Sequence, residues 1–146
     1  MKSLLDSGFA EKLPKDLHAF EHAFVVRPGF KYESLKSHCD QITFITDGVT
    51  TDLDDLVFQI SENLQYFQPE NDCLIPVGTT IANLLIGYYL CRKFQDLSLY
   101  IGIYNGNPLS GTQKGIDGDY TFYRLYMQNF YSAQLANSGD QENEMK

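Results

Sequence analysis

Two transitions from a strand-like apolar pattern to a helix-like one constrain this chain more than any other feature. Residues 41–47 (QITFITD) alternate as a strand does, and an apolar stripe at helical spacing follows over about 52–67. Residues 73–77 (CLIPV) form a short apolar run typical of a buried strand. A helix over about 80–94 follows that is apolar on nearly every side. Strands that alternate with helices in this way indicate an α/β or α+β sandwich with a mixed β-sheet and two main helices.

Further strand patterns lie on either side of this unit. Residues 20–27 read as a first strand, which ends at Pro28-Gly29. Residues 97–104 alternate cleanly, and residues 120–127 (YTFYRLYM) supply a partner strand, so the two predict a C-terminal hairpin. The expected order of elements is β-β-α-β-α-β-β.

Individual residues indicate how the helices begin, end and pack. Thr51 is a candidate N-cap, with Asp54 three residues further on as in a capping box. Pro69 is expected to end the first helix. In the second helix, Gly87 costs about 1 kcal/mol relative to alanine, which suggests close packing against a neighbouring backbone.

The length of 146 residues is near the commonest size for one domain, so we expect a single globular domain over residues 1–136. Within it, residues 1–19 are expected to form a peripheral N-terminal segment, and residues 137–146 a disordered acidic tail beyond it. The first residues carry charges where a signal peptide needs an apolar run, and the three cysteines are an odd number. We therefore expect a cytoplasmic protein with reduced thiols.

Net charge and aromatic content limit the kinds of partner that this chain can bind. A net charge of −8 argues against a protein that binds a nucleic-acid backbone, and no apolar run is long enough to span a membrane. Ten Tyr and ten Phe exceed what one small core can bury, which predicts a homo-oligomer, a dimer or higher. The alternative is that the first 40 residues wrap back over the surplus apolar surface.

The first candidate site is the turn before the second helix. Its residues are Gly78, Thr79, Thr80 and Asn83. A glycine there lets a ligand approach the backbone, and the free N–H groups and hydroxyls at a helix start can hold an anion. Open α/β sheets bind ligands at this end of their strands. The alternative is that Thr79 simply caps a buried helix.

The second candidate is the glycine-rich loop 106–118, which is longer than a hairpin needs. It can close over a ligand as a lid, with Lys114 as the charged contact, or it can be a plain mobile hairpin loop. Its G-x-x-x-x-G spacing lacks the lysine and hydroxyl of a phosphate-binding loop, and no helix follows it.

The third candidate is an aromatic face on the predicted hairpin. The residues that share faces of the two strands are Tyr100 and Tyr104 on one, and Tyr120, Phe122, Arg124 and Tyr126 on the other. If the two faces coincide, they form a platform that can stack a base and pair a phosphate with the guanidinium. The alternative is a cross-strand aromatic ladder that packs a helix or a second subunit.

Two further patterns carry weaker signals. Asp47-Gly48-Val49-Thr50-Thr51 follows an apolar strand and resembles the PRPP-binding loop of the type I phosphoribosyltransferases, with Gly48 in the place of the second acid. His18 and His22 are spaced to share a helix face, but no third ligand accompanies them, so structural or solvent-facing histidines are favoured over a metal site. We expect no metal and no cofactor.

One resemblance covers about residues 41–127. The run DCLIPVGTTIANLLIGYYL from Asp72, the segment LYIGIY and the closing strand YTFYR look like small phage-encoded proteins. In size and element order the chain is similar to the Thoeris anti-defence sponges. The resemblance implies a homo-oligomeric protein that sequesters cyclic ADP-ribose isomers or cyclic oligonucleotides in the host cytosol.

Together these observations predict a non-catalytic, homo-oligomeric binder of a nucleotide-like signalling ligand, possessing no catalytic residues. The expected ligand contacts are Gly78, Thr79, Thr80, Asn83, Tyr100, Tyr104, Lys114, Phe122 and Arg124. Two alternatives from other classes stay open: an acidic phage-type inhibitor that binds a host protein, and a small phosphoribosyl- or nucleotide-acting enzyme.

Overall fold

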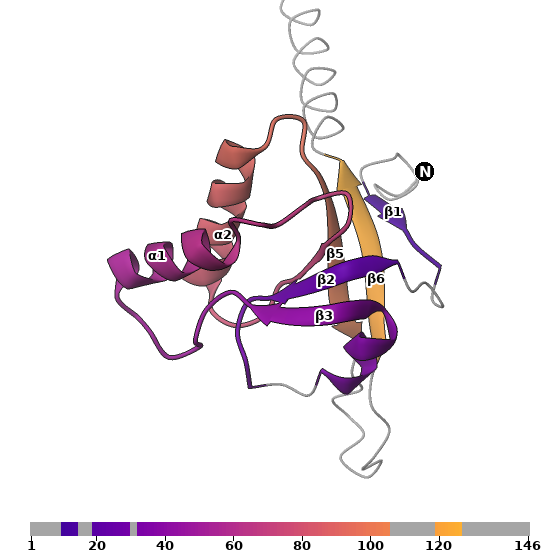
Figure 1. The fold of residues 1–146 in the computed structure, drawn as a ribbon, viewed down its shortest axis with the longest axis horizontal. Coiled ribbons are helices and arrows are strands. Elements are labelled where there is room, and N and C mark those ends of the chain that lie inside the picture. Colours follow the sequence, from indigo (N-terminus) through magenta and orange to yellow (C-terminus); the bar gives the residue numbers. More distant parts are fainter. Residues whose placement is uncertain (1–9, 15–18, 30–31, 106–118, 127–146) are drawn as a thin grey trace, which may run out of the picture.

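The computed structural model describes residues 10–14, 19–29, 32–105 and 119–126. Within them a six-stranded sheet has the order β1-β6-β5-β4-β2-β3 (Figure 1). The elements are β1 (Ala10–Lys12), β2 (Phe20–Val25), the 3₁₀ helix η1 (Glu33–Ser37), β3 (Cys39–Phe44), α1 (Leu53–Asn63), β4 (Cys73–Ile75), α2 (Thr80–Lys93), β5 (Ser98–Asn105) and β6 (Asp119–Tyr126).

The sheet is mixed, as the sequence predicts. Strands β3, β2, β4 and β5 are parallel neighbours, β6 pairs antiparallel with β5, and β1 pairs antiparallel with β6. The predicted α+β class, with two main helices and a C-terminal hairpin, is therefore confirmed. The structure adds one strand that the sequence does not predict, β1. Its three residues carry no alternating pattern, and it pairs with β6 at one edge of the hairpin.

Both helices pack on one face of the sheet. Each helix follows one parallel strand and returns the chain to the start of the next. Parallel strands require such a crossover connection, because a tight turn can join only antiparallel strands. In Figure 1 they lie together on one side, while β2 and β3 cross steeply over β5 and β6 because the strand twist accumulates. The core between helices and sheet consists of Phe24, Val26, Ile45, Ile60, Leu64, Phe67, Leu74, Ala82, Ile86, Leu90 and Leu97.

The opposite face of the sheet has a second core under η1. Its buried members are Phe20, Ala23, Val25, Tyr32, Leu35, Cys39, Cys73, Ile75, Tyr120 and Phe122. Gly102 makes room for this packing, because a Cβ at that position would lie 2.6 Å from Ile75 Cδ1 and 2.7 Å from Phe122 Cε1. A larger residue there would displace the centre of this core.

The first helix begins and ends at other residues than the sequence predicts. Its N-cap is Asp52, whose carboxylate accepts from the Asp55 amide, so the prediction of Thr51 was wrong. The helix ends at Asn63, well before Pro69. Leu64 and Phe67, which continue the apolar stripe, are both buried but follow the helix in a turn, with the Phe67 amide donating to the Leu64 carbonyl.

The strand after η1 begins two residues earlier than predicted and ends at Phe44. The chain continues alongside β2 for two more residues, because the amides of Ile45 and Thr46 donate to the Val25 and Val26 carbonyls. The three cysteines are unpaired, with Cys39 and Cys73 buried and Cys91 exposed.

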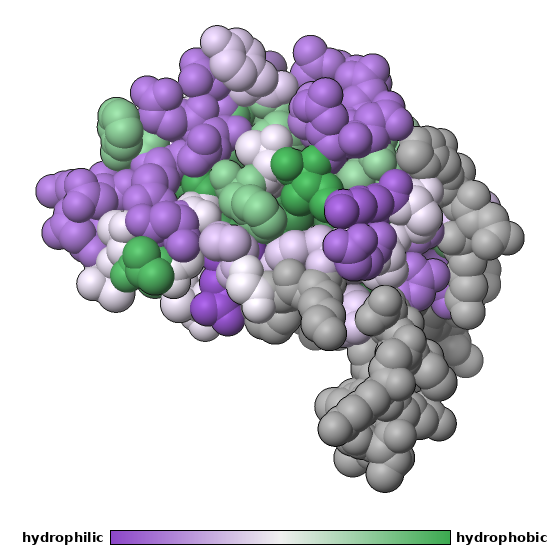
Figure 2. All heavy atoms as spheres, turned by 60° about the horizontal axis from the view of Figure 1, so that its bottom comes forward, coloured by the Kyte–Doolittle hydropathy of each residue, from purple (hydrophilic) through white to green (hydrophobic). Residues whose placement is uncertain are grey.

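Some expectations fall on residues outside those described: the loop 106–118 with Lys114, His18, and the tail 137–146. Among the helices that are described, none has the length and apolar character needed to cross a bilayer. Figure 2 turns the bottom of Figure 1 forward, with the loops that follow β2 and β3. Hydrophobic residues lie in the middle of this face, with hydrophilic ones above and to the left of them.

Candidate functional site

The sheet has a topological switch point between β2 and β4. These strands are parallel neighbours, but the chain leaves β2 toward β3 on one side and leaves β4 toward β5 on the other. In open α/β sheets, ligands bind in the crevice beyond the carboxyl ends of such a strand pair. In this protein that place is occupied by Arg27 after β2, by the turn with Gly78 after β4, and by the Asp47 loop after β3.

Arg27 lies between the turns that follow β3 and β4. A Cβ on Gly78 would stand 2.7 Å from Arg27 Cδ and 3.0 Å from its Nε, and one on Gly48 would stand 3.5 Å from Arg27 Cβ. Both glycines have positive φ, +86° at Gly78 and +81° at Gly48, which favours glycine at each turn. The group that approaches the Gly78 backbone is therefore the Arg27 side chain.

The start of α2 lies next to this arginine. Thr79 is the N-cap, and its hydroxyl accepts from the Ala82 amide at 3.4 Å. The Asn83 amide group donates to the Val77 carbonyl at 3.1 Å and to the Thr79 carbonyl at 2.9 Å. Thr79 and Asn83 thus fix the turn, while Thr80 is the exposed first residue of the helix. The positive end of the helix dipole and the guanidinium fall at the same place.

Asp47 organises the third loop of the site. Its Oδ1 accepts from the Val49 amide at 2.9 Å and from the Thr50 amide at 2.8 Å, and its Oδ2 accepts from the Thr50 hydroxyl and the Gln59 side chain. These bonds, with the Thr50 hydroxyl foremost, lower the pKa of Asp47 to about 2. Four donors fill the acceptor positions of this carboxylate, so its role in the structure is to hold the loop.

The loop after β2 is anchored to the opposite face of the sheet. The Tyr32 hydroxyl donates to the Arg27 carbonyl at 2.6 Å, and the Tyr32 ring lies 5.6 Å from that of Phe44. Tyr32 is itself part of the core under η1. The backbone of the arginine is therefore fixed by a buried side chain, and only its long side chain extends over the glycine turns.

The aromatic residues of the hairpin do share one face. In the register of β5 and β6, Tyr100 pairs with Arg124, Gly102 with Phe122, and Tyr104 with Tyr120. Phe122 is only 2% exposed, and its ring packs 5.0 Å from that of Phe20. Tyr104 is 45% exposed and lies 5.2 Å from the Tyr120 ring. This is the cross-strand ladder that the sequence left as the alternative, and it buries Phe122 within a core.

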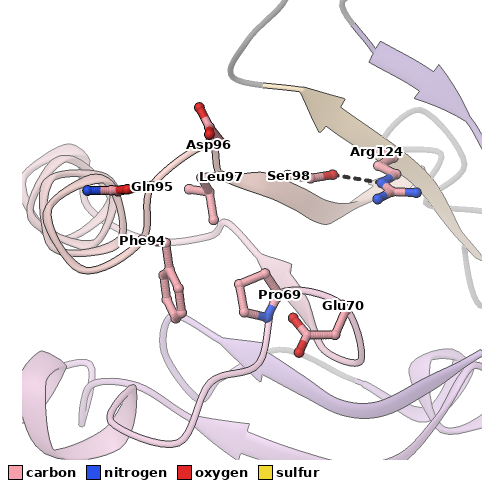
Figure 3. Close-up of a pocket in the computed structure, with 8 residues that line it drawn as sticks. All are labelled: Pro69, Glu70, Phe94, Gln95, Asp96, Leu97, Ser98 and Arg124. Atoms are coloured by element: carbon pink, nitrogen blue, oxygen red, sulfur yellow. Dashed lines mark hydrogen bonds between the residues drawn. The ribbon is translucent and has the colours of Figure 1, made fainter.

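Arg124 belongs to a separate pocket of about 260 Å³ (Figure 3). The pocket is lined by Pro69, Glu70, Phe94, Gln95, Asp96, Leu97, Ser98 and Arg124. The guanidinium carbon of Arg124 lies 5.2 Å from the Tyr100 ring centre and 5.0 Å from that of Tyr126, and its Nε donates to the Ser98 hydroxyl at 2.7 Å. This guanidinium is engaged within the hairpin, and two carboxylates accompany it, which weakens its attraction for an anion.

The two halves of the predicted site lie at opposite ends of the sheet. Arg124 is opposite Tyr100, which pairs with Cys73 at the start of β4, whereas Gly78 follows the end of β4. The structure does not bring Tyr100, Phe122 and Arg124 together with the turn. It places Arg27 there instead, which the sequence did not single out. An arginine at the carboxyl end of a predicted strand was the available signal.

The two histidines that the structure describes, His22 and His38, have structural partners. His22 Nε2 lies 2.6 Å from Gln41 Oε1, and its Nδ1 lies 3.8 Å from the buried Asp72 carboxylate. Burial raises the pKa of Asp72. His38, also buried, lies 3.1 Å from Asp119. In the described part of the chain, no group of three or more His, Cys, Asp or Glu side chains is placed to hold a metal ion.

Fold and site geometry define the class of protein: an α+β chain with a mixed sheet, in which Arg27 lies over the turn before α2 at the carboxyl ends of the parallel strands. Comparison with protein-family models, with curated proteins and with solved structures gave no match for this chain. Any function must therefore be argued from the chemistry of the site.

Proposed function

We propose that this protein binds a nucleotide-like signalling ligand without transforming it, and so sequesters it. The phosphate of the ligand is held at the start of α2, between the Arg27 guanidinium and the exposed first turn at Thr80. The ligand class is the one that the resemblance to the Thoeris anti-defence sponges implies, cyclic ADP-ribose isomers or cyclic oligonucleotides. The corresponding biological role is that of a phage anti-defence protein in the host cytosol.

The observation that carries this proposal is the position of Arg27 across Gly78. A guanidinium can bind phosphate with two parallel hydrogen bonds, and a helix N-terminus adds a favourable dipole. In a chain with a net charge of −8, Arg27 and the start of α2 bring positive charge together at one place. Such a site attracts a small anion more readily than an extended polyanion, which the overall charge repels.

Binding without catalysis is supported by how the polar side chains of the site are used. The Asp47 carboxylate accepts four hydrogen bonds, the Thr79 hydroxyl caps α2, and the Asn83 amide bridges two carbonyls of the turn. A general base or nucleophile needs an accessible lone pair beside the reacting atom. The geometry therefore favours a binder over the phosphoribosyl- or nucleotide-acting enzyme that the Asp47 loop first suggested.

Isothermal titration with cyclic ADP-ribose isomers and cyclic oligonucleotides tests this proposal, with nucleotide monophosphates included as simpler probes. We expect Arg27→Gln to lower the affinity by about 10-fold or more, because a charge-assisted bidentate contact is lost. Arg124→Gln is the matched control: it removes the same group from the pocket at the other end of the sheet.

The proposal fails if none of these compounds binds. It also fails if Arg124→Gln abolishes binding while Arg27→Gln leaves it intact, since the ligand then occupies the pocket of Figure 3. Chromatography of the ligand after incubation provides a second readout, which we expect to show the compound unchanged. Turnover that Asp47→Asn abolishes would support the enzyme instead.

A further inference from the structure

The outward side of α2 carries large apolar side chains. The exposed ones are Ile81 (44%), Leu84 (66%) and Tyr88 (67%), and the exposed Val57 (48%) of α1 lines a groove together with Tyr88. We call these four residues the α1–α2 patch. Surface helices normally present polar residues on this side, because only their inner stripe is buried. The patch therefore requires an explanation beyond the packing of α2 on the sheet.

A groove between the two helices includes Val57 and Tyr88 of the patch. It has a volume of about 300 Å³ and is lined by Val57, Ile60, Leu85, Tyr88, Tyr89 and Arg92. Apart from Arg92 and the tyrosine hydroxyls, these side chains offer only carbon atoms. The groove is suited to apolar side chains of another protein surface rather than to the charged ligand proposed above.

Gly87 lies in the same exposed stretch of α2, near the middle of the helix. A Cβ there would have no atom within 4 Å, so nothing within the described part of the chain requires glycine. Glycine inside a helix is less favourable than alanine, and close approach of another backbone is the usual reason to tolerate it. The neighbouring backbone that the sequence predicts at Gly87 is therefore not supplied by the described residues.

Charges of opposite sign flank the patch. Asp54 and Asp55 lie in the first turn of α1, and Arg92 and Lys93 lie in the last turn of α2. Lys93 donates to the Gln65 carbonyl at 2.6 Å, which leaves Arg92 as the base that borders the groove. In a contact with two-fold symmetry, residue i meets residue j and j meets i. A surface with acids at one end and a base at the other is then complementary to itself.

We propose that the α1–α2 patch is the two-fold interface between two copies of this chain, with Gly87 where the two α2 helices approach. The four side chains each expose roughly 100 Å², or on the order of 400 Å² of apolar surface together. A standard interface buries about 800 Å² per partner and is about 60% apolar, so it needs nearly 500 Å². The patch and the groove walls beside it come close to that requirement.

Sedimentation equilibrium of the full chain from high nanomolar to high micromolar concentration tests the interface. We expect a dimer that Leu84→Glu weakens about 30-fold or more, as truncation of a central contact does. Phe58→Glu is the matched control: Phe58 is 63% exposed on α1 but does not line the groove. Because Phe58, unlike Leu84, is not one of the four residues of the α1–α2 patch, we expect this variant to leave the dimer unchanged.

Two further variants keep the test decisive if Leu84→Glu fails to fold. Gly87→Ala is expected to raise the melting temperature of the monomer and yet weaken the dimer, which a merely structural glycine would not do. Arg92→Glu is expected to weaken the dimer, and adding Asp54→Lys is expected to restore it.

A chain that remains monomeric over the whole range overturns the proposal. So does a dimer that survives both Leu84→Glu and Arg92→Glu, or one that Phe58→Glu disrupts equally. A monomer whose patch instead binds a different protein overturns it as well, in favour of the inhibitor that the sequence left open.

Discussion

Replacement of Gly78 by alanine measures the contact on which the proposed site depends. The change has two costs that can be separated. An L-residue at φ +86° is strained by about 1–2 kcal/mol. The new Cβ would also stand 2.7 Å from Arg27 Cδ, so the arginine must move away from the turn, which adds about 1–2 kcal/mol as overpacking does. We therefore expect Gly78→Ala to lower the free energy of unfolding by about 2–4 kcal/mol.

Gly29→Ala is the control for backbone strain alone. Gly29 also has positive φ, +111°, but a Cβ there meets no atom within 4 Å. Its replacement is expected to cost only about 1–2 kcal/mol. Urea unfolding followed by circular dichroism measures both variants, and the difference between them reports the Arg27 contact.

A double-mutant cycle isolates that contact. In an Arg27→Ala background the obstructing side chain is absent, so Gly78→Ala should cost no more than Gly29→Ala does in the natural chain. The expected coupling free energy is about 1–2 kcal/mol, which lies above the error of such cycles. Equal costs of Gly78→Ala with and without Arg27 would refute the placement of the arginine over this turn.

The same structure makes three further predictions. Hydrogen bonds, chiefly from Thr50, depress the pKa of Asp47 from 3.8 to about 2. The stability that this carboxylate gives its loop should therefore be complete above pH 3.8 and be lost as the pH falls through about 2. A carboxyl resonance that titrates near 4 would contradict this. Burial raises the pKa of Asp72, so the stability of the protein should fall as the pH rises above 3.8. Asp72→Asn should therefore stabilise the protein at pH 7 in urea unfolding. A loss of stability in this variant would count against the raised pKa. Gly102→Ala should cost about 1–3 kcal/mol by crowding Phe122, and unchanged unfolding would exclude that packing.

The sequence predicts the central elements because their signals are local. The alternation in 97–104 and 120–127 places β5 and β6, and the apolar runs of 73–77 and 80–94 place β4 and α2, to within two residues. The predicted first helix extends too far because Leu64 and Phe67 keep the helical spacing after the helix has ended at Asn63. Both point into the core from a turn, and spacing alone does not separate the two cases.

The candidate site was predicted only in part, because it depends on which strands become neighbours. The Gly78 turn is visible as a local pattern of glycine and hydroxyls before a helix. The position of Arg27 beside it requires β2 to lie next to β4, with β3 on the other side. No local sequence pattern predicts that pairing of strands. The same long-range order separates Arg124 from the turn by the length of the sheet.

Amide and guanidinium NMR during a ligand titration tests the central claim most directly. With a cyclic ADP-ribose isomer or a cyclic oligonucleotide as the ligand, the account predicts saturable shifts centred on the Arg27 Nε–H and on the amides of Gly78, Thr79 and Thr80. The resonances of Ser98 and Arg124, at the other end of the sheet, should stay in place. Shifts centred on Ser98 and Arg124, or no saturable shift at Arg27 with any of these ligands, would contradict the account.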